Sequence, residues 1–204
     1  MNKLIVTVLV SAFLFVACNC PQSQQQNEPQ QSKRDIVLEN IHSRKSVRNF
    51  IEGKQIPKED IETLLKAAMA APTAVNLQPW HFIVVDNRAD LDALNQKLPY
   101  AKMLEKASAA IIVCGDTEIK AGDLSFWELD CSLASANILL AAEAMGLGAL
   151  WTAVYPTERT AFVQEYFNMP ANIVPLNLIP IGYPTGEDKP KDKYKPEKIH
   201  YNKW

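Results

Sequence analysis

Residues 127–145 have the sequence WELDCSLASANILLAAEAM, which is rich in apolar and small side chains and has almost no polar face. A helix of this composition is buried on all sides, so we expect it at the centre of the fold. Asp130 and Asn137 share one stripe of this helix. We interpret them as core polar groups satisfied by backbone hydrogen bonds, with a catalytic role as the alternative.

Helical and strand-like segments alternate on both sides of this helix from residue 35 onward, with no internal repeat. Their hydrophobic periodicity and their proline and acidic start signals define the expected elements. Helices are expected at residues 36–43, 57–71, 89–98, 101–107 and 157–167, and short buried strands at residues 81–85, 110–113, 150–154 and 176–181. The alternation predicts one layered α/β or α+β domain over residues 35–204.

Length and composition exclude several classes of protein. The 204 residues, 48% of them hydrophobic, suffice for one core, and a net charge of -2 disfavours nucleic acid as a partner. The sequence has no GxGxxG and no GxxxxGK[ST], which disfavours a Rossmann or P-loop site. Its three histidines are widely spaced and no CxxC or HExxH occurs, so we expect no metal site.

The N-terminal segment predicts export from the cytoplasm. Residues 1–17 carry Lys3 and then an apolar run too short to span a bilayer, which is typical of a secretory signal peptide. The run ends in LFVAC, which resembles a bacterial lipobox with Cys18 as the lipidated residue; a plain signal peptide or an uncleaved anchor is the alternative. Residues 18–34 are then a flexible, Gln-rich tether. We therefore expect a lipid-anchored membrane protein of the bacterial cell envelope. Cys114 and Cys131 look like small core residues, and we assign no disulfide.

Two segments carry side chains suited to a polar ligand. Residues 43–50 (SRKSVRNF) combine arginines, which offer a planar donor fork for phosphate, with hydroxyl donors. Residues 71–82 (APTAVNLQPWHF) present amides, which suit the edge of a heterocycle, in a loop fixed by two prolines. The alternatives are a solvated basic loop for the first segment and a turn with structural amides for the second.

Two further segments complete the candidate set. Residues 146–148 (GLG) turn a helix end directly into a strand, where backbone amides could face a planar ligand. Residues 187–204 hold six lysines against four acids and end with Ile199, Tyr201 and Trp204. A charge run is usually a solvated face, but these three apolar side chains predict that the tail packs on something.

The order and spacing of these four segments resemble the nitroreductase family of FMN-dependent oxidoreductases, across residues 35–204. RKSVR at residues 44–48 is similar to the opening flavin-binding stretch of the family. Residues 72–82 are similar to its Pro-Ser-x-x-Asn-x-Gln-Pro-Trp loop, with Thr73 in the serine place. The GLG turn and the segments 181–184 (IGYP) and 190–193 (PKDK) also match.

The resemblance implies an α+β sandwich with a central buried helix and a mixed, mostly antiparallel sheet. It also implies an obligate homodimer with two FMN sites at the subunit interface and a C-terminal extension that reaches the partner. Electrons would pass in a ping-pong mechanism from NAD(P)H, or from another donor, through FMN to nitroaromatic, quinone or similar acceptors. Alternatives with the same fold are a flavin-fragmenting, dehalogenating or desaturating enzyme, or a flavin-binding module without reductase activity.

The resemblance also assigns roles to individual residues at the phosphate end of the cofactor. Arg44 and Ser46 would bind the phosphate and ribityl groups, with further charge from Lys191 and Lys193. Arg48 would lie near the N1/O2 edge of the flavin, where a cation stabilises added negative charge.

Other residues would contact the flavin ring. Asn76 would bind the pyrimidine edge in the partner subunit's site, and the backbone at Ala153 and Val154 would approach N5. The best-known enzymes have Glu-Gly at these last two places. No acid or nucleophile is expected, because the flavin carries the chemistry. The remaining expected cofactor-binding residues are Lys45, Pro72, Thr73 and Gln78.

Overall fold

The structure is a computed structural model that describes residues 31–204. The expected signal peptide, Cys18 and all but the last residues of the tether lie outside the described residues. Within residues 31–204, no helix has both the length and the apolar character needed to cross a membrane.

Five antiparallel strands form the central sheet. They are β1 (Trp80–Val85), β2 (Ala109–Asp116), β3 (Gly148–Ala149), β4 (Thr152–Ala153) and β5 (Ile173–Gly182), in the order β1-β2-β5-β3 with β4 also paired to β5. The single strand expected at residues 150–154 is instead two short strands. Ala149 of β3 pairs with Ile181 of β5, and Thr152 of β4 pairs with Leu178 of β5. The two short strands therefore keep one register along β5, with an interruption at residues 150–151.

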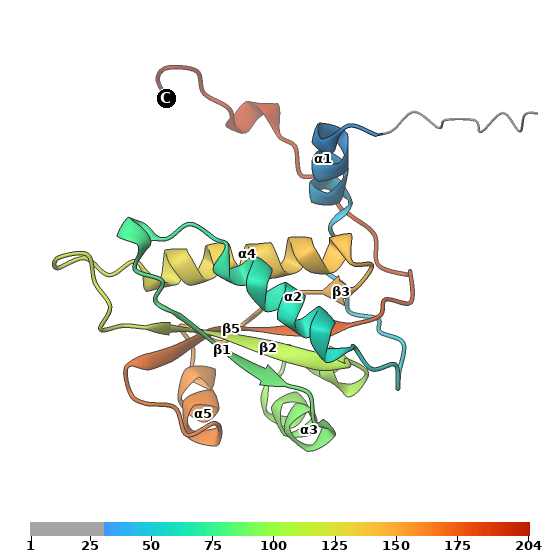
Figure 1. Cartoon of the computed structure of the whole chain (residues 1–204), viewed down its shortest axis with the longest axis vertical. Helices are drawn as coiled ribbons and strands as arrows, with labels where there is room; N and C mark the ends of the chain where they lie inside the picture. The colour runs from blue at the N-terminus through green and yellow to red at the C-terminus, as the bar shows by residue number, and fades with distance from the viewer. Residues whose placement is uncertain (1–30) are drawn as a thin grey trace, which may run out of the picture. The chain divides into compact units, whose positions relative to one another are not determined.

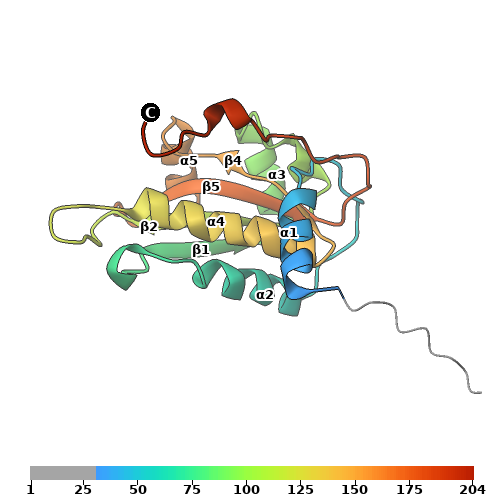
Figure 2. The same cartoon turned by 90° about the horizontal axis from the view of Figure 1, so that it is seen from above.

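Helices cover both faces of the sheet. The helices within residues 31–204 are α1 (Lys33–Ser43), α2 (Lys58–Met69), α3 (Arg88–Lys97), α4 (Trp127–Ala144) and α5 (Arg159–Tyr166), with 3-10 turns at Ala74–Asn76, Lys102–Glu105 and Pro196–Lys198. The helix expected at residues 101–107 is thus only a 3-10 turn. α2 and α4 lie side by side on one face, and α3 and α5 cover the other (Figures 1 and 2). α1 lies against α4 and not on the sheet (Figure 1).

The three layers follow from the two-residue period of β2. Ile111 and Val113 pack into the core beneath α2 and α4. Ile112 and Cys114 point the opposite way, into the core formed with α3 and α5. This arrangement explains the unbroken apolar run of β2, because both faces of the strand are buried. The expected α+β class is confirmed.

The expectation that α4 is buried on all sides is wrong for a single chain. α4 buries one stripe against the sheet and α2, whereas Leu129 and Leu133 are 62% and 45% exposed. α1 contacts α4, where the Asn40 side chain donates to the Leu140 carbonyl over 3.0 Å, yet α1 buries none of its residues. Together α1 and α4 present an apolar surface that one chain leaves uncovered.

The polar residues of α4 are structural, as expected. The Asp130 carboxylate accepts a hydrogen bond from the Ala74 N–H at 3.2 Å, and the Asn137 amide donates to the Ala67 carbonyl at 2.9 Å. Asp130 thereby fixes the loop that follows α2. Cys114 and Cys131 are free, buried core residues, and burial raises the pKa of each thiol to about 12.

Candidate functional site

Residues 44–50 run as an extended strip between β3 and the chain that follows β5. The Val47 N–H donates to the Ala149 carbonyl at 3.1 Å, and Phe50 bridges to Pro184. A Cβ atom on Gly148 would lie 2.6 Å from Val47 Cγ1. Gly148 therefore serves the close packing of this strip.

The other glycine of the GLG turn ends α4. Gly146 has φ +69°, and the Leu147 N–H donates to the Ala142 carbonyl at 2.8 Å, which is the Schellman arrangement. The turn sends the chain straight from α4 into β3. Its function is thus to deliver β3 to the edge of the sheet where residues 44–50 dock.

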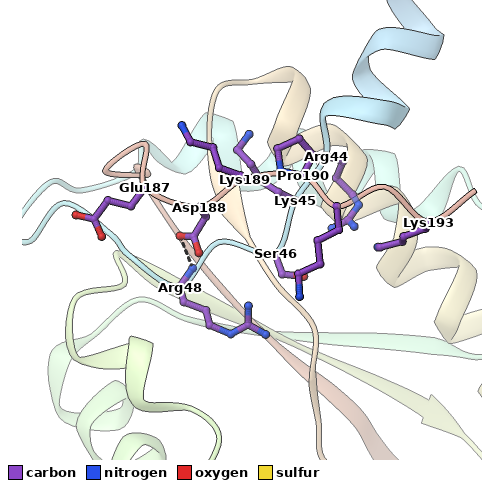
Figure 3. A pocket seen from close by; sticks show the side chains of 10 residues that line it. Arg44, Lys45, Ser46, Arg48, Glu187, Asp188, Lys189, Pro190 and Lys193 are labelled. Carbon is purple, nitrogen blue, oxygen red and sulfur yellow. Dashed lines mark hydrogen bonds between the residues drawn. The ribbon is translucent and has the colours of Figure 1, made fainter.

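The strip and the C-terminal tail together enclose a cavity of about 530 Å³, which we call the cationic cavity (Figure 3). It holds six basic and two acidic side chains, so a negatively charged ligand is favoured there. In the view of Figure 3, Arg48 and Lys193 lie on opposite sides of Ser46. The lining residues are Arg44, Lys45, Ser46, Arg48, Glu187, Asp188, Lys189, Pro190, Lys191 and Lys193.

Asp188 ties the strip to the tail. Its Oδ2 accepts hydrogen bonds from the Arg48 N–H at 2.9 Å, the Asn49 N–H at 3.1 Å and the Asn49 side-chain amide at 3.3 Å. The carboxylate thus fixes the backbone that carries Arg48. Asp188 was not predicted as a site residue, although its place shortly after the IGYP segment is a signal that could have identified it.

The cations of the cavity differ in their partners. Lys45 Nζ lies 2.8 Å from the Glu143 carboxylate in the last turn of α4, so much of its charge is already neutralised. None of the three ion pairs among residues 31–204 includes Arg44, Lys191 or Lys193. These three side chains are therefore the better candidates for binding an anion.

A second cavity, of about 410 Å³, lies beside β4, and we call it the β4 cavity. Arg48 lines both cavities, which makes them neighbours. Ala153 lines the β4 cavity, but the Val154 side chain is buried and its N–H donates to the Leu176 carbonyl at 3.1 Å. Of the two residues expected near the flavin, only Ala153 faces this space. The full lining is Arg48, Tyr100, Leu150, Trp151, Thr152, Ala153 and Arg159.

Two lining residues of the β4 cavity, Tyr100 and Arg159, were not predicted. Arg159 begins α5, and its Nη1 donates to the Ala153 carbonyl at 3.2 Å. Tyr100 belongs to the connection after α3. No motif marks either residue, because only the packing of α3 and α5 under the sheet brings them to β4.

The loop before β1 has an unusual backbone. Val75, Asn76 and Gln78 have φ of 42°, 60° and 52°, a region that a β-branched residue such as Val75 rarely adopts. Local bonds hold the loop: the Gln78 N–H donates to Thr73 Oγ1 at 3.2 Å, and the Gln78 amide donates to Asn76 Oδ1 at 3.0 Å. Val75 at its tip is 78% exposed.

This loop lies far from the cationic cavity of its own chain. β1 begins at Trp80, which pairs with Gly115 of β2, and Gly115 in turn pairs with Val174 near the start of β5. The strip docks at the opposite end of β5, beyond Gly182. A ten-residue strand spans about 30 Å. The structure therefore does not bring Pro72, Thr73, Asn76 and Gln78 together with the basic residues in one chain.

Comparisons with known proteins agree with this architecture. The model of the nitroreductase family matches residues 41–99 and 87–183. A "Putative NADH dehydrogenase/NAD(P)H nitroreductase" of Methanothermobacter thermautotrophicus is 45% identical over 174 residues, which cover 85% of this chain and 90% of that protein.

Two solved structures extend the likeness. A Bacteroides thetaiotaomicron protein of the same name is 51% identical with a TM-score of 0.78, over 82% of this chain and 98% of that one. An FMN-dependent nitroreductase of Clostridium difficile is 28% identical with a TM-score of 0.75, over 82% and 99% of the two chains. This chain belongs to the nitroreductase family.

Proposed function

We propose that the protein is an FMN-dependent oxidoreductase of the nitroreductase type. It takes electrons from NAD(P)H, or from another donor, and passes them to nitroaromatic, quinone or similar acceptors. The observation that carries the proposal is the pair of neighbouring cavities joined at Arg48. One is strongly cationic, and the other is lined by apolar and aromatic groups together with two arginines. An FMN reductase of Bacillus subtilis, 26% identical over 81% of this chain, supports the cofactor assignment.

The residues present fit FMN. A phosphate dianion suits the cationic cavity, where Arg44 offers a guanidinium fork and Ser46 a hydroxyl donor. The flat ring suits the β4 cavity, whose walls include Leu150 and Trp151. The two volumes, about 530 Å³ and 410 Å³, lie in the range of small-molecule sites.

Each part of the chain then has a defined role in the reaction. Bound FMN would supply the redox chemistry, accepting a hydride from the donor and releasing electrons to the acceptor. Arg48 would hold positive charge near the bound flavin and so favour the uptake of electrons, and Asp188 holds the Arg48 backbone in place. Donor and acceptor would use in turn the part of the β4 cavity that the ring leaves open, which gives ping-pong order.

We propose a homodimer as the working form of the protein. The loop that carries Asn76 and the cationic cavity lie at opposite ends of β5, so this loop can complete a flavin site only in a second copy. The uncovered apolar surface of α1 and α4, with Leu129 and Leu133, supplies a face for that copy. Exposed Trp204 in the tail adds apolar area to the same association.

Flavin binding tests the proposal directly. The cationic cavity should make FMN bind more tightly than riboflavin, which has the same ring without the phosphate, by about tenfold or more. Fluorescence titration of the purified full chain measures both affinities. Equal affinities, or failure of the folded chain to bind either flavin, would contradict the assignment of this cavity.

We further propose that the chain is exported and anchored through Cys18, on the strength of the short apolar segment, the Ala17-Cys18 junction and the Gln-rich tether. Cys18→Ala should abolish labelling by a fatty-acid analogue and release the protein from membranes. Cys20→Ala is the matched control and should leave both unchanged. Labelling that persists in the Cys18 variant would exclude this residue as the anchor.

A further inference from the structure

Arg159 at the start of α5 faces the β4 cavity with most of its hydrogen-bonding capacity unused. A guanidinium has five N–H donors, and within residues 31–204 the Arg159 guanidinium makes one hydrogen bond, to the Ala153 carbonyl at 3.2 Å. Its Nε is buried and has no hydrogen-bond partner among these residues, and none of their ion pairs includes Arg159. Buried polar groups are normally paired, so this side chain is suited to an external acceptor.

Arg88 shows what an arginine with a purely structural role looks like in this fold. Its Nε lies 2.9 Å from the Asp92 carboxylate, and its two terminal nitrogens donate to the carbonyls of Leu104 at 2.6 Å and Glu105 at 3.1 Å. Arg88 thereby ties down the 3-10 turn beside Tyr100. The contrast indicates that Arg159 is not needed in the same way for folding.

The surroundings of Arg159 are aromatic. The Arg159 Cζ lies 5.3 Å from the centroid of the Tyr100 ring, and Tyr100 is 69% exposed. Trp151 lines the same space, and the buried Thr152 Oγ1 has no hydrogen-bond partner within the described residues either. A cation beside an exposed aromatic ring suits a planar ligand that carries a carboxylate or a phosphate.

We propose that Arg159 and Tyr100 form a subsite for the anionic substituent of a molecule that exchanges electrons in the β4 cavity. This proposal rests on the proposed function. The anion has two possible sources, which share their chemistry: a carboxylate on an aromatic acceptor, or a phosphate of the dinucleotide donor. Arg159 thus selects substrates by charge and takes no part in the electron transfer itself.

Binding of an unreactive probe tests the subsite without turnover. Benzoate and benzamide differ in charge and little in shape, so isothermal titration of the FMN-loaded protein with each measures the preference for an anion. We expect benzoate to bind about tenfold or more tightly than benzamide, and Arg159→Gln to abolish the difference. Arg159→Lys should keep part of it. Lys120→Gln, which removes an exposed charge elsewhere, is the control and should keep all of it.

The source of the anion follows from the two half-reactions. Anaerobic reduction of the bound flavin by NADH or NADPH isolates the donor, and reoxidation by 4-nitrobenzoate or by neutral nitrobenzene isolates the acceptor. If Arg159→Gln slows only reduction by the dinucleotides, the subsite binds a donor phosphate. If it slows only reoxidation by 4-nitrobenzoate, the subsite binds an acceptor carboxylate.

Two further results would overturn the subsite. One is an Arg159→Gln variant that binds FMN normally and prefers the charged probe over the neutral one as strongly as the wild type does. The other is an equal loss for charged and neutral probes, which would make Arg159 a support for β4 only. Failure of the wild-type chain to bind FMN is a separate result, which would contradict the proposed function instead.

Discussion

Arg44 and Arg48 lie four positions apart in one strip and share the cationic cavity, but only one of them reaches the β4 cavity. Arg44 lines the cationic cavity, whereas Arg48 also reaches the β4 cavity. Arg44→Ala should therefore weaken FMN binding by about 1.5–3 kcal/mol, the usual value for a hydrogen bond to a charged group, and barely change the reduction potential. Arg48→Gln should do the reverse and lower the midpoint potential, because its charge acts mainly after electrons arrive. FMN titration and potentiometry separate the two effects. Equal, small changes in FMN affinity and midpoint potential in both variants would show that neither arginine belongs to the flavin site.

The two acids of the cationic cavity should respond in opposite directions. Removing a carboxylate near a phosphate relieves Coulomb repulsion, so Glu187→Gln should strengthen FMN binding. Asp188→Ala should instead weaken FMN binding by about 1 kcal/mol or more, since the Arg48 and Asn49 N–H groups lose their acceptor. Fluorescence titration of both variants decides. Tighter binding by the Asp188 variant would show that its carboxylate acts only as a repulsive charge.

At the scale of elements, the strip of residues 44–50 depends on a glycine in β3. Gly148→Ala should destabilise the fold by about 1–3 kcal/mol, because the new Cβ meets Val47 Cγ1 at 2.6 Å. Val47→Ala removes that atom, so the double variant should lose less than the sum of the two single variants. Urea unfolding of the four proteins measures this coupling. Additive losses would mean that the two residues do not constrain each other.

Most elements were predictable because their signals are local. Pro57 and Pro72 bracket α2, and the apolar runs of β2 and β5 mark buried strands. β1 is a strand as predicted, but it buries only Trp80 and Val85, because the face of this edge strand is only partly covered. The break between β3 and β4 was not predictable, since pairing to β5 alone decides where residues 150–151 leave the sheet. The partial exposure of α4 was not predictable either. Its sequence is apolar on every side, but whether Leu129 is covered depends on other chains.

At the scale of the whole molecule, the tail tests the proposed dimer. A chain ending at residue 198 keeps Lys191 and Lys193 but loses Ile199, Tyr201 and Trp204. If the tail holds the partner subunit, this chain should dimerise more weakly and lose FMN together with the dimer, because ligand and interface are thermodynamically linked. Sedimentation with absorbance at the flavin band follows both. A truncated monomer that retains FMN fully would show that one chain builds the whole site.

The candidate site was only partly predictable for a related reason. Arg44, Ser46 and Arg48 are adjacent in sequence and came from one motif, and Lys191 and Lys193 from another. The structure brings both sets to one cavity. Asn76 belongs to a motif as well, but it lies at the opposite end of β5 from the cationic cavity. Its proposed role in flavin binding therefore depends on a second chain. Tyr100 and Arg159 belong to no motif, and only tertiary packing brings them to β4.

Anaerobic reduction shows whether this chain uses bound FMN to carry electrons. The FMN-loaded full chain is mixed with NADH, NADPH or a quinol, and absorbance at the flavin band is followed before and after addition of a nitroaromatic or a quinone. At least one donor should bleach the band, and the acceptor should restore it. Bound FMN that dithionite reduces but none of these donors does would contradict this use of FMN and leave a flavin-binding module without reductase activity.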